Sequence, residues 1–272
     1  MESKKENKTH DCLENLDKNC KCTVCMKISH ANSEPLYIVE QSVDDYFITG
    51  FTERKVAEKF GVRHLTVIIV PFVADGENAG KWIVHDRTAK QWAKGKLDCK
   101  TPSYNLFGGH CTADVTQIGL IGSKIPQEIC DSAAKRELEE ELLCFDGSIC
   151  LEIWENKRKT DCFVNACPYE ANDLIPIGFS SYADKDNIEF SYIYALPVPE
   201  KDLSTLVAAD NYVINEMEHN VSLPIVVLSE IDLLVLSQTD YSIEVCDAIT
   251  RLWNAENKVV IDKLRTVIKK YQ

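Results

Sequence analysis

The sequence predicts a mixed α+β domain over residues 34–272, and three observations carry this prediction. Short apolar runs of strand length alternate with helix-like segments, a pattern typical of mixed domains. The apolar run at residues 62–73 is rich in β-branched residues, as expected of a buried strand. Residues 125–143 have helical composition and begin near Pro126, a residue favoured in the first turn of a helix.

The elements that precede this helix follow from local patterns. The segments LYIVE (36–40) and YFITGF (46–51) flank a polar turn and are interpreted as two short strands. The segment TERKVAEKFG predicts a short helix that ends at Gly61, since glycine readily takes a left-handed cap. The segment KWIVHDR (81–87) follows a glycine-containing turn and is predicted to form the second strand of a hairpin.

A long polar loop is expected at residues 88–104, before the segment NLFGGHC. Further strands are predicted at LIPIGFSSY, IEFSYIYALPV and PIVVLS. From Tyr241 onward the pattern indicates two amphipathic helices, which form a C-terminal extension of the domain. The apolar faces of these helices carry Ile243, Ile249, Leu252 and Trp253.

Composition limits the function classes. A net charge of −13 argues against a partner such as a nucleic acid polymer, because neutralising a phosphate backbone needs a basic surface. No apolar run approaches the length that spans a bilayer, and the N-terminus lacks the apolar centre of a secretory signal. We therefore expect a cytoplasmic protein with no membrane partner. A small phosphorylated ligand fits this composition, and a homodimer is compatible with it.

Residues 1–33 are interpreted as a polar, cysteine-rich N-terminal appendage. Cys20, Cys22 and Cys25 form a C-x-C-x-x-C motif, and a C-x-x-C turn can present two thiolates to one tetrahedral Zn²⁺. The sequence offers no second pair at a supporting spacing, so free thiols are favoured over structural Zn²⁺ at these residues. In a cytoplasmic chain the twelve cysteines are expected to be thiols or metal ligands rather than disulfides.

Carboxylates crowd the end of the predicted helix at residues 125–143. Residues at i, i+3 and i+4 share one face of a helix, so Glu137, Glu140 and Glu141 should form one stripe, with Glu139 on another side. Three like charges on one face repel unless a cation compensates, and oxygen ligands suit Mg²⁺. The alternative is a solvated acidic helix face without chemistry, which is common.

The wider spacing favours the cation site. Gly122, five residues, Glu128, seven residues and then RELEEE from Arg136 resemble the signature of the Nudix hydrolases. The resemblance implies an α/β/α sandwich, the Nudix fold, with a mixed sheet between helices. It also implies Mg²⁺, or Mn²⁺ in its place, held by Glu137, Glu140 and Glu141, and an Arg136–Glu128 pair that orients the helix.

The match to this signature has departures. Leu143 stands where the signature has its second glycine, and Cys144 replaces an aliphatic residue. A Gly-Gly pair precedes the signature in the family, and here it lies early, at Gly108-Gly109. We therefore favour an insertion after Gly109, with Gly122 as the alternative counterpart of the first glycine. The lost second glycine should alter how the helix ends, and it removes no metal ligand.

Gly50 with Arg54, His64 with its strand, Arg87 with Lys90, and Gly109-His110 follow one another along the chain. In this order they resemble the Nudix branch that includes isopentenyl-diphosphate isomerase, and the resemblance covers roughly residues 36–235. The catalytic cysteine of that isomerase corresponds to Gly108, so an isomerase is disfavoured. The five metal ligands of the isomerase correspond to Ala57, His64, His110, Asn187 and Glu189, of which two cannot serve in that role. A histidine on a strand is more often a satisfied core residue than a ligand, so His64 and His110 receive little weight as ligands.

The resemblance implies a Mg²⁺-dependent hydrolase of a phosphoanhydride, on a nucleoside diphosphate linked to another group or a similar small diphosphate. Either Glu140 or Glu189 would take the proton from the attacking water. Arg87, Lys90 and His110 would bind the substrate. The alternative is a Nudix-fold module that binds a nucleotide or a protein without hydrolysis, and an isomerase ranks third.

Overall fold

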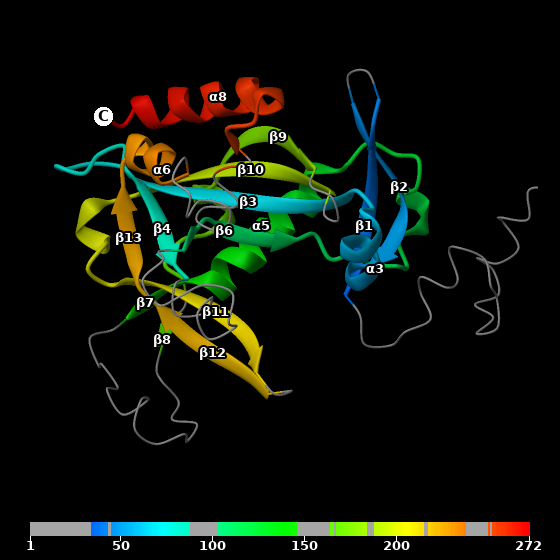
Figure 1. Ribbon diagram of the computed structural model, residues 1–272, viewed down its shortest axis with the longest axis horizontal. Coiled ribbons are helices and arrows are strands. Elements are labelled where there is room, and N and C mark those ends of the chain that lie inside the picture. Colours follow the sequence, from blue (N-terminus) through cyan, green and yellow to red (C-terminus); the bar gives the residue numbers. More distant parts are fainter. Residues whose placement is uncertain are drawn as a thin grey trace, which may run out of the picture. The chain divides into compact units, whose positions relative to one another are not determined.

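The computed structural model describes residues 34–42, 45–87, 103–145, 164–165, 167–183, 188–214, 217–237, 250 and 252–272. They form two compact units, which are treated separately below (Figure 1). Unit 1 comprises the described parts of Met1–Leu65, His110–Gln127 and Tyr182–Phe190, and unit 2 comprises those of Thr66–Gly109, Glu128–Ser181 and Ser191–Gln272. The mixture of strands and helices confirms the predicted α+β class. The N-terminal appendage lies outside the described residues.

Unit 1 begins with the predicted hairpin and helix. Strands β1 (Pro35–Gln41) and β2 (Tyr46–Glu53) pair antiparallel, and helix α3 (Arg54–Phe60) follows directly. Gly61 ends α3 with φ 59°, and its N–H bonds back to the carbonyl of Ala57. This confirms the expected left-handed glycine cap, since few other residues take that conformation without strain.

The segment after Gly109 is folded onto unit 1 by backbone hydrogen bonds. It contains the 3-10 helix η1 (Ile118–Leu120). The N–H of Gly122 donates to the carbonyl of Ile48 at 2.7 Å, and the N–H of Ile48 donates to the carbonyl of Ser123 at 3.0 Å. These bonds extend the pairing of β2, so the segment is an ordered part of the unit.

The main strand of unit 2 is β3 (His64–Val73), of which the first two residues, His64 and Leu65, are counted in unit 1; all ten residues are buried. Full burial explains why this strand reads as a continuous apolar run rather than an alternating one. β3 pairs with β4, β6 and β10, while β4 also pairs with β5 and β13, and β9 pairs with β10. The bounds are β4 (Trp82–Asp86), β5 (Tyr104–Asn105), β6 (Phe107–His110), β9 (Ile175–Ala183), β10 (Ile188–Val198) and β13 (Ile225–Leu228).

Three α-helices belong to unit 2: α5 (Gln127–Glu141), α6 (Glu230–Ser237) and α8 (Lys258–Lys269). Short 3-10 helices are found at η3 (Ala171–Asp173), η4 (Glu200–Asp202) and η5 (Ala255–Asn257). Within the described ranges, no helix is both long and apolar enough to cross a membrane.

Helices pack on both faces of the unit 2 sheet. Ile193 and Ala195 of β10 lie in one core cluster with residues of α6 and α8. Tyr194 points to the opposite face, because side chains alternate along a strand, and its hydroxyl donates to Asp131 of α5 at 2.6 Å. Burial and this bond raise the pKa of Tyr194, so the phenol keeps its proton. In unit 2, α5 therefore covers one face, and α6 and α8 cover the other (Figure 1).

Unit 2 also contains a second sheet that the sequence reading did not predict. Its strand order is β12-β11-β7-β8. The bounds are β7 (Leu142–Phe145), β8 (Val164–Asn165), β11 (Leu206–Ile214) and β12 (Met217–Leu223). The predicted helix end at residue 143 was two residues too late, because α5 stops at Glu141 and Leu142 opens β7. Leu143 is extended and pairs with Val207 instead of capping a helix.

The C-terminal extension is confirmed in part. α8 is amphipathic and buries Val260, Ile261, Leu264 and Ile268. Leu252 and Trp253 pack against the same core, as the apolar pattern indicated. The expected positions of Ile243 and Ile249 lie outside the described residues.

Asn257, at the start of α8, holds the edge of β9. Its Oδ1 accepts the N–H of Ser181 at 2.9 Å, and its Nδ2 donates to the carbonyl of Ser181 at 3.0 Å. Asn257→Ala should lower the free energy of unfolding by about 2 kcal/mol, since both backbone groups lose a partner at a buried site. Urea denaturation measures this. Lys258→Ala, at an exposed neighbour, should change stability by less than about 0.5 kcal/mol, and equal losses would contradict the account.

Candidate functional site

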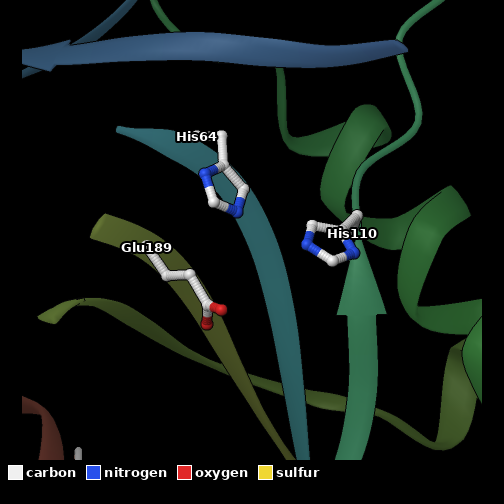
Figure 2. Close-up of side chains that lie close together, drawn as sticks. All are labelled: His64, His110 and Glu189. Carbon is white, nitrogen blue, oxygen red and sulfur yellow. The ribbon is translucent and has the colours of Figure 1, made fainter. Parts of the chain in front are cut away.

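Three side chains of unit 1 form a group that could hold a metal ion. His64, His110 and Glu189 each offer one ligand atom, and these atoms lie within 4.8 Å of one another. Figure 2 shows the side chains converging from β3, β6 and β10. The residues are far apart in the sequence, so the pairing of strands brings them together. Among the described residues, this is the one group of three His, Cys, Asp or Glu side chains with such geometry.

The ring of His64 is held in a form that suits metal binding. It is fully buried, and its Nδ1 lies 2.9 Å from the carbonyl oxygen of Val62. A carbonyl only accepts, so Nδ1 carries the proton and donates it. In the neutral ring Nε2 then presents a lone pair, and no residue in the described part of the chain makes a hydrogen bond to it. A buried acceptor left in this state needs an explanation, and a backbone carbonyl on the other nitrogen is the usual arrangement around a metal-bound histidine.

The donor set indicates which ions would fit. The rings of His64 and His110 stack with centroids 5.1 Å apart at 25°. Two imidazoles and one carboxylate favour first-row ions such as Mn²⁺, Fe²⁺ or Zn²⁺ over Mg²⁺. Three protein ligands also leave coordination positions open, which is characteristic of catalytic rather than structural metal sites.

The carboxylates of α5 belong to unit 2 and divide into two sets. Glu141 accepts the backbone N–H of Gly108 at 2.8 Å through Oε2. Glu137 is buried and lies against Gly109. The side chain of Glu140 is 54% exposed. The structure therefore turns two of the three predicted metal ligands toward the Gly-Gly backbone of β6 and leaves the third at the surface. The three do not form a preassembled group of the kind found in unit 1, where the described residues are concerned.

Arg136 contacts two carboxylates at its own end of α5, and the expected pairing with Glu128 stays a prediction. Its Nη2 lies 2.7 Å from Glu137 Oε1, and its Nη1 lies 3.5 Å from Glu140 Oε2. Glu128 is exposed in the first turn of α5. Eight residues of helix separate Glu128 from Arg136, a rise of roughly 12 Å, whereas Glu137 and Glu140 are one and four residues away. The guanidinium consequently neutralises carboxylates of its own helix end.

The other predicted site residues are only partly described. Arg87 follows β4, and its backbone N–H donates to the carbonyl of Ser103 at 2.6 Å. Lys90 lies outside the described residues, as do Cys20, Cys22 and Cys25, so their predicted roles stay predictions. His110 was predicted to bind substrate and Glu189 to serve as base or ligand, and the structure places both in the unit 1 group.

The sequence-based interpretation gave too little weight to His64 as a metal ligand. The interpretation as a satisfied core histidine was wrong for Nε2, although the burial it implies is correct. The available signal was the match of three residues to a five-ligand metal site. The partners of Glu137 and Glu141 were also missed, and the Gly-Gly pair was the signal for them, since glycine permits close approach to a backbone.

No protein-family model matches the chain, and no curated protein matches it in sequence. The functional assignment therefore depends on the residues and their geometry.

Proposed function

We propose that this protein is a divalent-metal-dependent hydrolase of a phosphoanhydride in a small diphosphate compound, built on a Nudix fold. The observation that carries the proposal is the unit 1 group of His64, His110 and Glu189, in which a buried ligand nitrogen has no hydrogen-bond partner among the described residues. The signature spacing from Gly122 to Glu141 and the two-sided helix packing in unit 2 support the same assignment.

An ion bound by the unit 1 group would polarise a phosphoryl oxygen and lower the pKa of a bound water. His64 would contribute Nε2, because its other nitrogen donates to Val62. Glu189 would contribute negative charge that partly offsets the ion. Mn²⁺ fits these ligands better than Mg²⁺ does, while Mg²⁺ remains the ion proposed for the oxygen ligands of α5.

In unit 2, Glu137 and Glu141 would supply oxygen ligands, and Glu140 is the remaining candidate for ligand or base. The 2.7 Å contact between Arg136 and Glu137 holds a buried carboxylate in place and offsets its charge, which suits a metal ligand. Hydrolysis of a phosphoanhydride needs charge neutralisation and positioning more than covalent chemistry, so carboxylates and a metal are a sufficient set.

The geometry of Gly108 is further evidence against the hypothesis that the protein is an isomerase. Gly108 has φ 140°, and a Cβ placed on it would overlap the carbonyl oxygen of Val67 and lie 3.0 Å from the Cα of Ile68. Both obstacles are backbone atoms, so a cysteine cannot be accommodated by moving a side chain.

Gly108→Cys should therefore lower the free energy of unfolding by about 2–3 kcal/mol or more, through steric overlap and a strained backbone. It should yield no isomerase activity. Urea denaturation and incubation with isopentenyl diphosphate measure the two outcomes. Gly119→Ala is the matched control, because a Cβ there meets nothing within 4 Å. A stable Gly108→Cys protein that forms the allylic isomer would contradict the account.

One observation favours a second candidate, a binding module without catalysis. Glu137, Glu140 and Glu141 are engaged by Arg136 or by the β6 backbone, an arrangement that also suits a purely structural helix. Calorimetric titration with Mn²⁺ and Mg²⁺, with and without a panel of diphosphates, separates the two. A hydrolase gives sustained heat of turnover that depends on metal. A binding module gives saturable heat with no product, and that result would reject the hydrolase.

A further inference from the structure

We propose that Gly109 is a positioning residue that seats the carboxylate of Glu137 against strand β6. A Cβ built on Gly109 would lie 2.5 Å from Glu137 Oε1 and 2.6 Å from both Cδ and Oε2. The whole carboxylate thus occupies the space where any other residue carries its first side-chain atom. The value of this seat for metal binding rests on the proposed function, in which Glu137 is a ligand.

Burial and an ion pair also hold the carboxylate of Glu137 in this position. The side chain of Glu137 is only 9% exposed, and Arg136 Nη2 lies 2.7 Å from its Oε1. One turn further along α5, Glu141 is held by the N–H of Gly108 at 2.8 Å. Neighbouring residues of β6 therefore fix two carboxylates that share a stripe of the helix, one by leaving room and one by donating a hydrogen bond. A ligand that is held in one orientation binds metal at less entropic cost than a mobile one.

The two glycines have different requirements, which allows the role of Gly109 to be isolated. Gly108 needs its positive φ, and backbone atoms block a side chain there. The φ of Gly109 lies outside the left-handed region, and its obstacle is the end of a flexible side chain. Alanine at 109 should therefore fold and displace the Glu137 carboxylate, whereas alanine at 108 should disturb the strand itself.

The test is a double-mutant cycle of Gly109→Ala and Glu137→Asp, read as Mg²⁺ affinity by calorimetry. Gly109→Ala should weaken Mg²⁺ binding about 10- to 100-fold, the usual cost of losing a residue that orients a ligand. Glu137→Asp alone should also weaken it, because the shorter side chain falls short of the seat. The double variant should bind at least as well as Gly109→Ala, since removing one methylene makes room for the new Cβ. Losses that multiply in the double variant would overturn the proposal.

Two control variants distinguish the steric effect of a Cβ at residue 109 from nonspecific destabilisation of the fold. Gly119→Ala should leave Mg²⁺ affinity unchanged, because a Cβ there meets nothing. Gly108→Ala should not be rescued by Glu137→Asp, because its obstacle is the carbonyl of Val67. Rescue at position 108 would mean that the aspartate acts by some route other than making room, and would overturn the proposal.

The position of the Glu137 carboxylate against Gly109 can also be tested if Glu137 proves not to bind metal. Glu137→Gln should abolish the Mg²⁺ binding in question, and unchanged binding would reject Glu137 as a ligand under the proposed function. The same cycle read as the midpoint of urea denaturation then decides the seat. If Gly109→Ala lowers the midpoint and adding Glu137→Asp restores it, the steric role of Gly109 is supported. If the two losses are additive, the proposal is overturned.

Discussion

His64→Ala is expected to weaken Mn²⁺ binding by more than about 100-fold. The loss of a direct ligand should exceed the 10- to 100-fold cost of losing a residue that only orients one. His64 is the fully buried residue of the group, and its Nε2 has no hydrogen-bond partner within the described ranges. Calorimetric titration of the metal-free protein with Mn²⁺ measures the effect.

Because His64 is buried, its alanine variant also loses packing, so a second variant is needed. Glu189→Gln keeps the size of the side chain and removes its charge, and it should weaken Mn²⁺ binding in the same direction. His85→Leu is the matched control, since His85 is a buried histidine of β4 that stacks on Phe107 in unit 2. Dissociation constants within about threefold of the wild-type protein for both His64→Ala and Glu189→Gln would remove the metal site from the account.

Glu141→Gln is expected to lower kcat by about 100- to 1,000-fold while the protein stays folded. The change is isosteric, so the contact with the N–H of Gly108 can persist, but the charge that would hold the cation is lost. Neutralising a group that acts on the transition state commonly has an effect of this size. Metal-dependent release of phosphate from the diphosphate that proves to be hydrolysed measures kcat, and Glu140→Gln should behave alike.

Glu139→Gln is the control for register. Glu139 lies 3.8 Å from Lys135, on an exposed part of the same helix, and outside the predicted stripe. Its replacement should leave kcat within about twofold, the level of an ordinary surface change. An equal loss of activity in Glu139→Gln and Glu141→Gln would mean that only the total charge of the helix matters. That result would contradict the assignment of Glu141 from the Nudix-like signature.

Local sequence patterns predicted the elements whose residue types directly reflect burial or backbone conformation. β3 is buried along its whole length and reads as a continuous apolar run, and Gly61 marks the end of α3 by its left-handed conformation. β11 and β12 were missed because their sequence is rich in Asp, Asn and Glu, which are depleted in strands. Their pairing with β7 is a long-range choice that no local window contains.

α6 had a local signal that was overlooked. The N–H of Asp232 donates to Ser229 Oγ at 3.1 Å, and the N–H of Ser229 donates to Asp232 Oδ2 at 3.1 Å. This reciprocal pair is a capping box with aspartate in place of glutamate, and the spacing Ser229-x-x-Asp232 is visible in the sequence. The helix is short and largely apolar, so its pattern resembles a strand, and the cap was the feature that distinguished it.

For the candidate site, the sequence indicated residue types but not partners. Helical spacing put Glu137 and Glu141 on one stripe, and the structure places both against β6. Spacing could not show that Glu140 turns outward to Arg136, because that depends on which side of α5 packs on the sheet. The meeting of His64, His110 and Glu189 depends on strand pairing across more than one hundred residues, which only the fold determines.

We propose that this chain hydrolyses a phosphoanhydride and that the reaction requires a bound divalent metal. The most direct measurement is a screen of small diphosphate compounds, which follows the release of phosphate or pyrophosphate from the full chain with Mn²⁺, with Mg²⁺ and with excess chelator. We predict release from at least one compound that requires metal and is lost in both His64→Ala and Glu141→Gln. Absence of release at saturating metal, or release that persists in chelator, would contradict the claim.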